Sequence, residues 1–425
     1  MTTDETPTDQ NPTDQTPADP TPTPGRPAPA PERPAPAPEA PALPRHDLPA
    51  GSSTPAPPEA AELDDWDPLA TQRTPEDPPL DVLLSGTVFF DIVFTGMERL
   101  PQPGEELWSK GMGSSPGGIA NLATAAARLG LRTGLVAGFG DDAYADWMWH
   151  TMESEEGIDL SASRRFTDFH SSLTVSIAAH GDRAMTTHGH DLPEPLSALI
   201  AKAPAARAAV VDLAGETSWW AELARHGALV FADIGYDETG RWDPADLAPL
   251  AHCHAFTPNA VEAMGYTRTD SPDRAVRALA EKVPLAVVTD GADGAYAIDG
   301  STGEEAYCPA VPVTAIDTTG AGDVFTAAMV LGTLAGWPLE ERLKFGSLCS
   351  ALAVQQFGGS LAAPGWGDIT DWWRSLSSAA DGGDLRAAYT RGGYQFLDDV
   401  VPDHRVQGRR RAQGTFALRS DAGKH

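Results

Sequence analysis

A glycine-rich run that ends in aspartate is the part of this sequence with the clearest chemical use. Residues 316–325 read Ile-Asp-Thr-Thr-Gly-Ala-Gly-Asp-Val-Phe, and an apolar, helix-compatible stretch follows at once. Gly320 and Gly322 have no Cβ, so backbone N–H groups can close around an oxyanion where the helix begins and its dipole favours negative charge. Beside a bound phosphate, the Asp323 carboxylate can take the proton of an attacking hydroxyl. The run predicts a phosphoryl-transfer site; the alternative is a turn in which Asp323 only caps a helix.

The same run resembles the C-terminal signature of the PfkB, or ribokinase-like, carbohydrate kinases over its whole length. The resemblance implies that Gly320, Ala321 and Gly322 form an anion hole and that Asp323 is the catalytic base. It also implies ATP as the phosphoryl donor, with Mg²⁺ beside the phosphates. In some members of that family the first aspartate of the run lies near a monovalent-cation site, which would place K⁺ near Asp317.

A second stretch, residues 115–121, reads Ser-Pro-Gly-Gly-Ile-Ala-Asn and is similar to the N-terminal signature of that family. The family pattern has two glycines, three variable residues and then asparagine. Here either the glycine pair lies one place nearer Asn121 or Pro116 replaces the first glycine. The resemblance implies that Gly117, Gly118 and Asn121 contact the hydroxyls of the phosphoryl acceptor. The alternative is a plain loop before a helix, with Asn121 in its first turn.

Asp91 is expected at the end of the first strand, five residues after Gly86. Its position resembles that of an early aspartate with which the family binds sugar hydroxyls. A carboxylate suits a polyol because each oxygen can accept a hydrogen bond from a hydroxyl. The alternative is a solvated aspartate at a strand end.

Two further motifs resemble the magnesium and nucleotide sites of the family. Asn259 and Glu262 match its N-x-x-E motif, which orders Mg²⁺ and water near the phosphates, although a capped helix start has the same pattern. Thr289, Gly291 and Gly294 match a T-x-G-x-x-G turn that lets the backbone approach ATP, although a tight hairpin turn has this pattern too.

These motifs fall among strands and helices that alternate along the chain from a first strand beginning at Asp81. The alternation predicts a three-layer α/β/α sandwich with a mainly parallel sheet. The resemblance implies the ribokinase-like form of this fold, with a small β lid from segments near 94–114 and 170–190 and a homodimer through that lid. The apolar patterns predict strands at 208–214, 228–234, 255–259, 285–291 and 294–299, and helices at 119–130, 142–157, 322–336 and 340–356.

Composition excludes several classes of partner. The 425 residues carry a net charge of −30, so nucleic acid and anionic membrane surfaces should repel the chain. No stretch approaches the roughly 18–20 apolar residues of a membrane span. The acidic N-terminus lacks the apolar segment of a secretory signal, and the three scattered cysteines favour reduced thiols in a cytoplasmic protein. Residues 1–78, rich in Pro, Ala and Thr, are expected to be a disordered tail, 79–400 the kinase domain and 401–425 a polar tail.

The sequence thus predicts ATP- and Mg²⁺-dependent phosphorylation of a hydroxyl on a sugar or sugar-like small molecule. A nucleoside kinase of the same fold and a non-catalytic sugar- or nucleotide-binding regulator are the alternatives. Two histidine pairs, His188 with His190 and His252 with His254, each offer two metal ligands. Neither has the four-ligand spacing of a zinc site, so we interpret both as structural, or His188 as substrate-facing.

Overall fold

Strands and helices alternate along the described part of the chain. In the computed structural model these residues are 66–179, 182–237, 239–403 and 406, all within the compact unit Ala60–His425. Most of the expected N-terminal tail and of the expected tail at 401–425 lies outside the described residues, so both stay predictions there. No helix among the described residues is long and apolar enough to cross a membrane.

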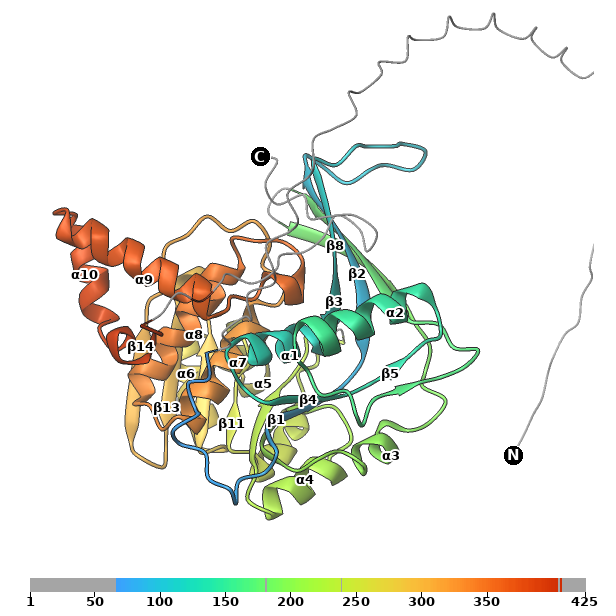
Figure 1. Cartoon of the computed structure of the whole chain (residues 1–425), viewed down its shortest axis with the longest axis horizontal. Coiled ribbons are helices and arrows are strands. Elements are labelled where there is room, and N and C mark those ends of the chain that lie inside the picture. Colours follow the sequence, from blue (N-terminus) through green and yellow to red (C-terminus); the bar gives the residue numbers. More distant parts are fainter. Residues whose placement is uncertain (1–65, 180–181, 238, 404–405, 407–425) are drawn as a thin grey trace, which may run out of the picture. The chain divides into compact units, whose positions relative to one another are not determined.

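The central sheet has the order β14-β13-β12-β11-β10-β9-β1-β4, counted over the described residues (Figure 1). From β12 to β4 the neighbours run parallel, whereas β13 and β14 continue the sheet as antiparallel strands. The predicted mainly parallel sheet is therefore confirmed. The strand bounds are β1 Leu80–Ser85, β4 Thr133–Val136, β9 Ala206–Asp212, β10 Leu229–Asp233, β11 Ala255–Phe256, β12 Leu285–Thr289, β13 Ala295–Asp299 and β14 Glu304–Cys308.

Helices cover both faces of this sheet. On β9, Ala208 and Val210 join one apolar cluster, while Ala209 and Val211 join another on the opposite face. A parallel strand buried on both faces needs apolar residues at successive positions, which is why these strands are continuous apolar runs. The first cluster holds α1 Ile119–Arg128, α7 Ala321–Leu334, α8 Leu339–Ala353 and α9 Trp366–Asp381, and the second holds α4 Ser218–Arg225, the 3₁₀ helix η2 Pro244–His252, α5 Ala260–Thr267 and α6 Pro272–Ala280.

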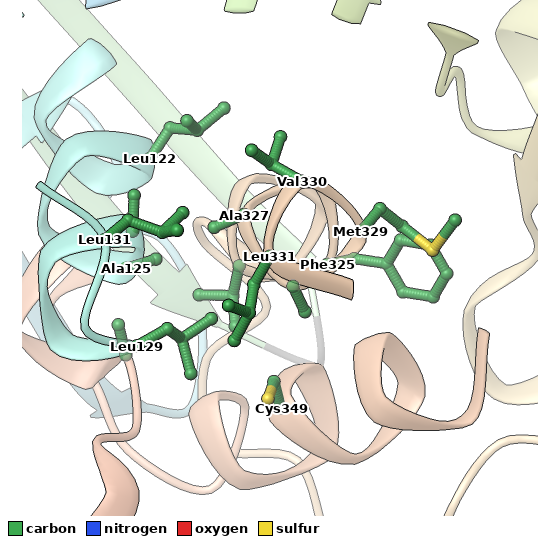
Figure 2. Packing of buried hydrophobic residues seen from close by; sticks show 14 of the residues in the cluster. Leu122, Ala125, Leu129, Leu131, Phe325, Ala327, Met329, Val330, Leu331 and Cys349 are labelled. Carbon is green, nitrogen blue, oxygen red and sulfur yellow. The ribbon is translucent and has the colours of Figure 1, made fainter. Parts of the chain in front are cut away.

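Helix α7 lies at the centre of the first cluster. Its residues from Val324 to Gly332 are all buried, as expected for a helix that is apolar on every side. Figure 2 shows Leu122 and Ala125 of α1 facing α7, with Cys349 of α8 on another side of it. This packing fixes the position of the helix whose first turn carries the predicted anion hole. Cys349, Cys253 and Cys308 are free and buried, in agreement with the expected reduced thiols.

A separate four-stranded sheet forms the lid, with the order β3-β2-β7-β8 (Figure 1). It includes the expected lid segments but is larger, because residues 88–93 form part of its strand β2 instead of continuing the first strand. Gly117 and Gly118 lie on strand β3 and not in a loop. The homodimer through this lid stays a prediction. The lid strands are β2 Val88–Met97, β3 Gly111–Gly118, β7 Ser172–Ala179 and β8 Asp182–His188.

Residues 66–78 pack on the domain, so the expected disordered tail does not extend to residue 78. Leu69 is completely buried in the first apolar cluster. Arg73 is nearly buried and forms ion pairs with Asp67 and with Asp81 of β1. One leucine and one arginine thus attach a proline-containing segment that composition alone assigns to the tail.

A buried ion pair joins α1 to two later segments. Arg128, at the last residue of α1, donates from Nη2 and Nε to the Glu156 carboxylate over 2.7 and 2.8 Å. Its Nη1 donates to the carbonyl oxygen of Ala363 over 2.7 Å and to that of Leu361 over 3.2 Å. The Arg128 side chain has no exposed surface. Loss of any one partner would therefore leave a buried charge or polar group uncompensated. Helix α2, Ala143–His150, and the π-helical turn η1, Thr151–Glu155, lead to Glu156.

Candidate active site

The glycine-rich run forms the sharp turn that starts α7. Gly320 is the N-cap, and its φ of 76° is a left-handed conformation that favours glycine. The Asp317 carboxylate accepts hydrogen bonds from Thr319 N–H (2.9 Å) and Thr319 Oγ1 (2.6 Å). Its other oxygen accepts from Gly358 N–H over 3.3 Å. Asp317 therefore orders this turn, and the monovalent-cation role expected near it stays a prediction.

Asp323 lies in the first turn of α7 and contacts the N-terminal motif. Asn121 Nδ2 donates to Asp323 Oδ2 over 3.2 Å, joining two residues that are 202 positions apart in the chain. Burial raises the pKa of Asp323 to about 6, and the hydrogen bond from Asn121 opposes part of this rise. A carboxyl with this pKa is mostly ionised at neutral pH, and it is a stronger base than an ordinary aspartate.

Asp91 lies in the interior of strand β2 and is nine-tenths buried, so it is not a solvated residue at a strand end. Its strand partner on β3 is Ser115, two residues before Gly117. A Cβ added at Gly117 would lie 1.9 Å from Asp91 Oδ2, which is closer than two non-bonded atoms can approach. The glycine therefore leaves the space that the Asp91 carboxylate fills. Gly118, the next residue, is the N-cap of α1.

Sequence reasoning predicted Asn121 but missed Ser115 and Gly359, which lie beside it. Within the described residues, Ser115 Oγ and Asn121 Oδ1 are buried and have no hydrogen-bond partner. A Cβ at Gly359 would lie 2.7 Å from Asn121 Oδ1 and 3.7 Å from Ser115 Oγ, so both atoms face the backbone of Gly359. Buried polar atoms without partners are costly, and hydroxyl groups of a ligand would satisfy them. The Gly-Gly pair at 358–359 was the available signal.

The expected nucleotide residues line a cavity of about 500 Å³ next to the start of α7. Thr289 ends β12, Gly291 begins the 3₁₀ turn η3, Gly291–Asp293, and Gly294 follows this turn and leads into β13. The motif is thus both a hairpin turn and part of a cavity wall. Ala321 and Gly322 of the glycine-rich run also line this cavity. Most of the remaining lining is apolar: Ala292, Ala310, Val311, Pro312, Val313, Ala315, Phe325, Ala351 and Val354.

Asn259 and Glu262 form a capping box at the start of α5. Asn259 Oδ1 accepts from Glu262 N–H over 3.0 Å, and Glu262 Oε2 accepts from Asn259 N–H over 2.9 Å. The motif therefore caps the start of a helix, which was the alternative interpretation of its pattern. The box uses one carboxylate oxygen of Glu262, and the second oxygen is the group through which water around Mg²⁺ can be held.

Asp233 is a third carboxylate near this site, at the carboxyl end of β10. Burial raises its pKa well above the ordinary range, and the negative charges of Glu262 and Asp323 add to the rise. Burial also raises the pKa of Glu262. The charges of Glu262 and Asp323 both act on the pKa of Asp233, and a divalent cation would relieve this repulsion between oxygen ligands, so the donor set fits Mg²⁺. The sequence feature that could have predicted Asp233 as a site residue is its position at the end of a buried parallel strand.

The geometry agrees with comparisons to known proteins. Residues 91–365 match the sequence profile of the pfkB family of carbohydrate kinases. The chain belongs to this family. Within it, a fructokinase from Klebsiella pneumoniae is 31% identical over 280 residues, covering 60% of this chain and 88% of the relative. A 5-dehydro-2-deoxygluconokinase from Geobacillus thermodenitrificans is 23% identical over 338 residues, covering 72% of this chain and 96% of the relative.

A solved structure confirms the ribokinase-like fold of this pfkB-family kinase. The structure of Arabidopsis thaliana ribokinase complexed with ribose and ATP has a TM-score of 0.57 and 22% identity to this chain. The match covers 69% of this chain and 98% of the Arabidopsis protein. The kinase class and the three-layer fold predicted from sequence are therefore confirmed. The family match begins at Asp91, so β2 lies within the matched region from that residue onward.

Proposed function

We propose that this carbohydrate kinase transfers the γ-phosphoryl group of ATP to a hydroxyl of a sugar or sugar-like small molecule, with Asp323 as the general base. The hydrogen bond between Asn121 and Asp323 is the observation that carries the proposal. It joins the residues expected to hold the acceptor to the residue expected to activate it. The acceptor oxygen forms a bond to the γ-phosphorus, its proton passes to Asp323, and the bond to ADP breaks.

The N-terminus of α7 supplies the charge stabilisation for this transfer. Its first-turn amides have no partners within the helix, and the helix dipole adds positive potential there. Ala321 N–H donates to Thr318 O over a long 3.3 Å within the turn. We therefore assign the stronger part of the anion hole to the amides that follow, beginning with Gly322. The adjoining apolar cavity between Gly291 and Phe325 fits the base and ribose of ATP.

Mg²⁺ supplies neutralisation of phosphate charge when it is bound with ATP. Asp233, Asn259 and Glu262 are the residues that would hold it, through water for the last two. Asp91, Ser115 and Asn121 would hold the acceptor, because a carboxylate, a hydroxyl and an amide oxygen can each accept from a sugar hydroxyl. Gly117 leaves room for the Asp91 carboxylate, and Gly359 leaves room beside Asn121 Oδ1. The relatives are named as a fructokinase and a 5-dehydro-2-deoxygluconokinase, so we propose a class of sugar-like acceptors and not one compound.

The direct test is ADP formation from MgATP with a panel of sugars, deoxy-sugar acids, sugar phosphates and nucleosides. We expect turnover with at least one sugar-like acceptor and loss of this turnover in the Asp323→Asn protein. Preferential turnover of nucleosides would move the acceptor class to nucleosides. Binding of ATP and a sugar without any turnover would contradict the kinase proposal and favour a non-catalytic regulator.

Replacing Gly117 by alanine should lower kcat/KM for the acceptor by about 100-fold, because a methyl group there displaces the Asp91 carboxylate. The KM for ATP should change little, since the nucleotide cavity does not include this residue. Steady-state kinetics with each substrate varied in turn measures both effects. Gly392→Ala is the matched control, because a Cβ there meets no atom within 4 Å. An unchanged acceptor kcat/KM in Gly117→Ala would remove Asp91 from the acceptor site.

The rate should fall on the acidic side with a midpoint near pH 6. Asp323 must be ionised to accept a proton, and its pKa of about 6 means that it becomes protonated as the pH falls through this value. Below the midpoint we expect kcat/KM for the acceptor to fall about tenfold per pH unit, measured at saturating MgATP. A profile that stays flat down to pH 4.5 would show that a different group sets the rate.

A further inference from the structure

Three histidines gather at the edge of the lid, outside the site described above. One ligand nitrogen each from His170, His188 and His190 lies within 4.8 Å of the other two. Of the histidine, cysteine and acidic side chains in the described residues, these three form a group whose ligand atoms lie this close together. The ring centroid of His170 lies 5.1 Å from that of His188 and 4.5 Å from that of His190. The three side chains are exposed.

The chemistry of these donors selects the class of ion. Imidazole nitrogen suits Zn²⁺, Cu²⁺ and Ni²⁺, whereas Mg²⁺ prefers oxygen. In a tetrahedral zinc site with bonds of about 2.0–2.1 Å, ligand nitrogens are about 3.4 Å apart. The limit of 4.8 Å on the present nitrogen–nitrogen distances exceeds this value by about 1.4 Å, and rotation of the exposed side chains can close such a gap. Three protein ligands also leave a fourth position for water.

His170 already has the hydrogen bond that orients a metal ligand. Its Nδ1 lies 3.2 Å from the carbonyl oxygen of Ser171, to which this nitrogen can donate, leaving Nε2 as the metal donor. Ser171 is itself held in place, because its N–H and Oγ both donate to Asp142, over 2.6 and 3.0 Å. Asp142 is the N-cap of α2. This chain of contacts connects the orientation of His170 to the body of the domain.

Strand register separates the histidines from the acceptor site. His188 pairs with Leu173 on β7, and Leu173 pairs with Phe90 on β2. Residues paired across a sheet point to the same face, and successive residues along a strand alternate. His188 therefore shares a face with Phe90, and Asp91 points to the opposite face. The expectation that His188 faces the substrate is not supported by this register.

We propose that His170, His188 and His190 form a binding site for one divalent transition-metal ion of the Zn²⁺ class, with water in the remaining position. The ion would link the end of β8 to the segment before β7, and through Ser171 and Asp142 to α2. It would thereby fasten the outer hairpin of the lid to the domain on the face away from the acceptor. The site is independent of the proposed phosphoryl transfer.

Isothermal titration calorimetry of the untagged full chain with ZnCl₂ tests the site. We expect one equivalent to bind tightly, and each of His170→Ala, His188→Ala and His190→Ala to weaken binding by at least about 100-fold, the upper end of the loss for removing an outer-shell partner. His226→Ala is the matched control, since His226 is exposed at the C-terminal end of α4 and, among the described residues, belongs to no cluster of three such ligands. An equal concentration of MgCl₂ should not compete.

Absorption spectra of the Co²⁺-loaded protein provide a second measurement that does not depend on affinity alone. The wild-type protein and His226→Ala should share one visible spectrum, and the triple alanine variant should lose it. Because the three side chains are exposed, the variants should keep the circular dichroism of the wild type. Zinc bound with unchanged affinity and stoichiometry by the triple variant would overturn the proposal, as would the absence of any bound equivalent in the wild type.

Discussion

Asp323→Asn should lower kcat by about 10³-fold, within the range contributed by a general base. The amide keeps the size of the side chain but cannot take a proton from the acceptor hydroxyl. The KM values should change much less, because the variant leaves the cavity at Gly291 and the acceptor residues Asp91 and Ser115 in place. Single-turnover kinetics with MgATP and the preferred acceptor would measure the chemical step directly.

Stability provides a control for this variant. The pKa of Asp323 is raised in the folded protein, so above its ordinary value of 3.8 the ionised carboxylate opposes folding relative to a neutral group. At pH 7.5 Asp323→Asn should therefore be at least as resistant to heat as the wild type, and a loss of activity would not reflect unfolding. If the variant kept more than about a tenth of wild-type kcat, Asp323 would not be the general base.

Arg128→Met should lower the free energy of unfolding by about 3–5 kcal/mol, the range for removing one partner of a buried ion pair. The change leaves Glu156 buried and charged, with 3% of its side chain exposed. It also removes the hydrogen bonds to the carbonyl oxygens of Leu361 and Ala363, close to the turn that contacts Asn121. Urea unfolding followed by circular dichroism gives the free-energy difference.

Two further variants identify the cause of this loss. Replacing both partners, Arg128→Met with Glu156→Leu, should recover a large part of the stability, because no isolated buried charge remains. Arg391→Ala breaks the pair with Asp381, which is 73% exposed, and should cost no more than about 1 kcal/mol. Equal losses from Arg128→Met and Arg391→Ala would show that burial does not determine the contribution of these pairs.

The sequence by itself determined the features that depend on neighbouring residues. The turn at Gly320 requires glycine at a positive φ, and the capping box of Asn259 and Glu262 closes within three positions, so both can be read from local spacing. The continuous apolar strands predicted a parallel sheet because burial on both faces leaves no place for alternation. The family signature then indicated which of these local features carry chemistry.

Tertiary structure alone decided which distant groups meet. Asn121 contacts Asp323, Gly359 faces Ser115, and the charge of Glu262 raises the pKa of Asp233. The sequence around each of these residues does not indicate its partner. The segment before β7 likewise brings His170 to His188 and His190, and strand register turns His188 to the face opposite Asp91. The physical reason is that contacts across the fold depend on helix packing and strand order, which are set by the whole buried core rather than by the residues that use them.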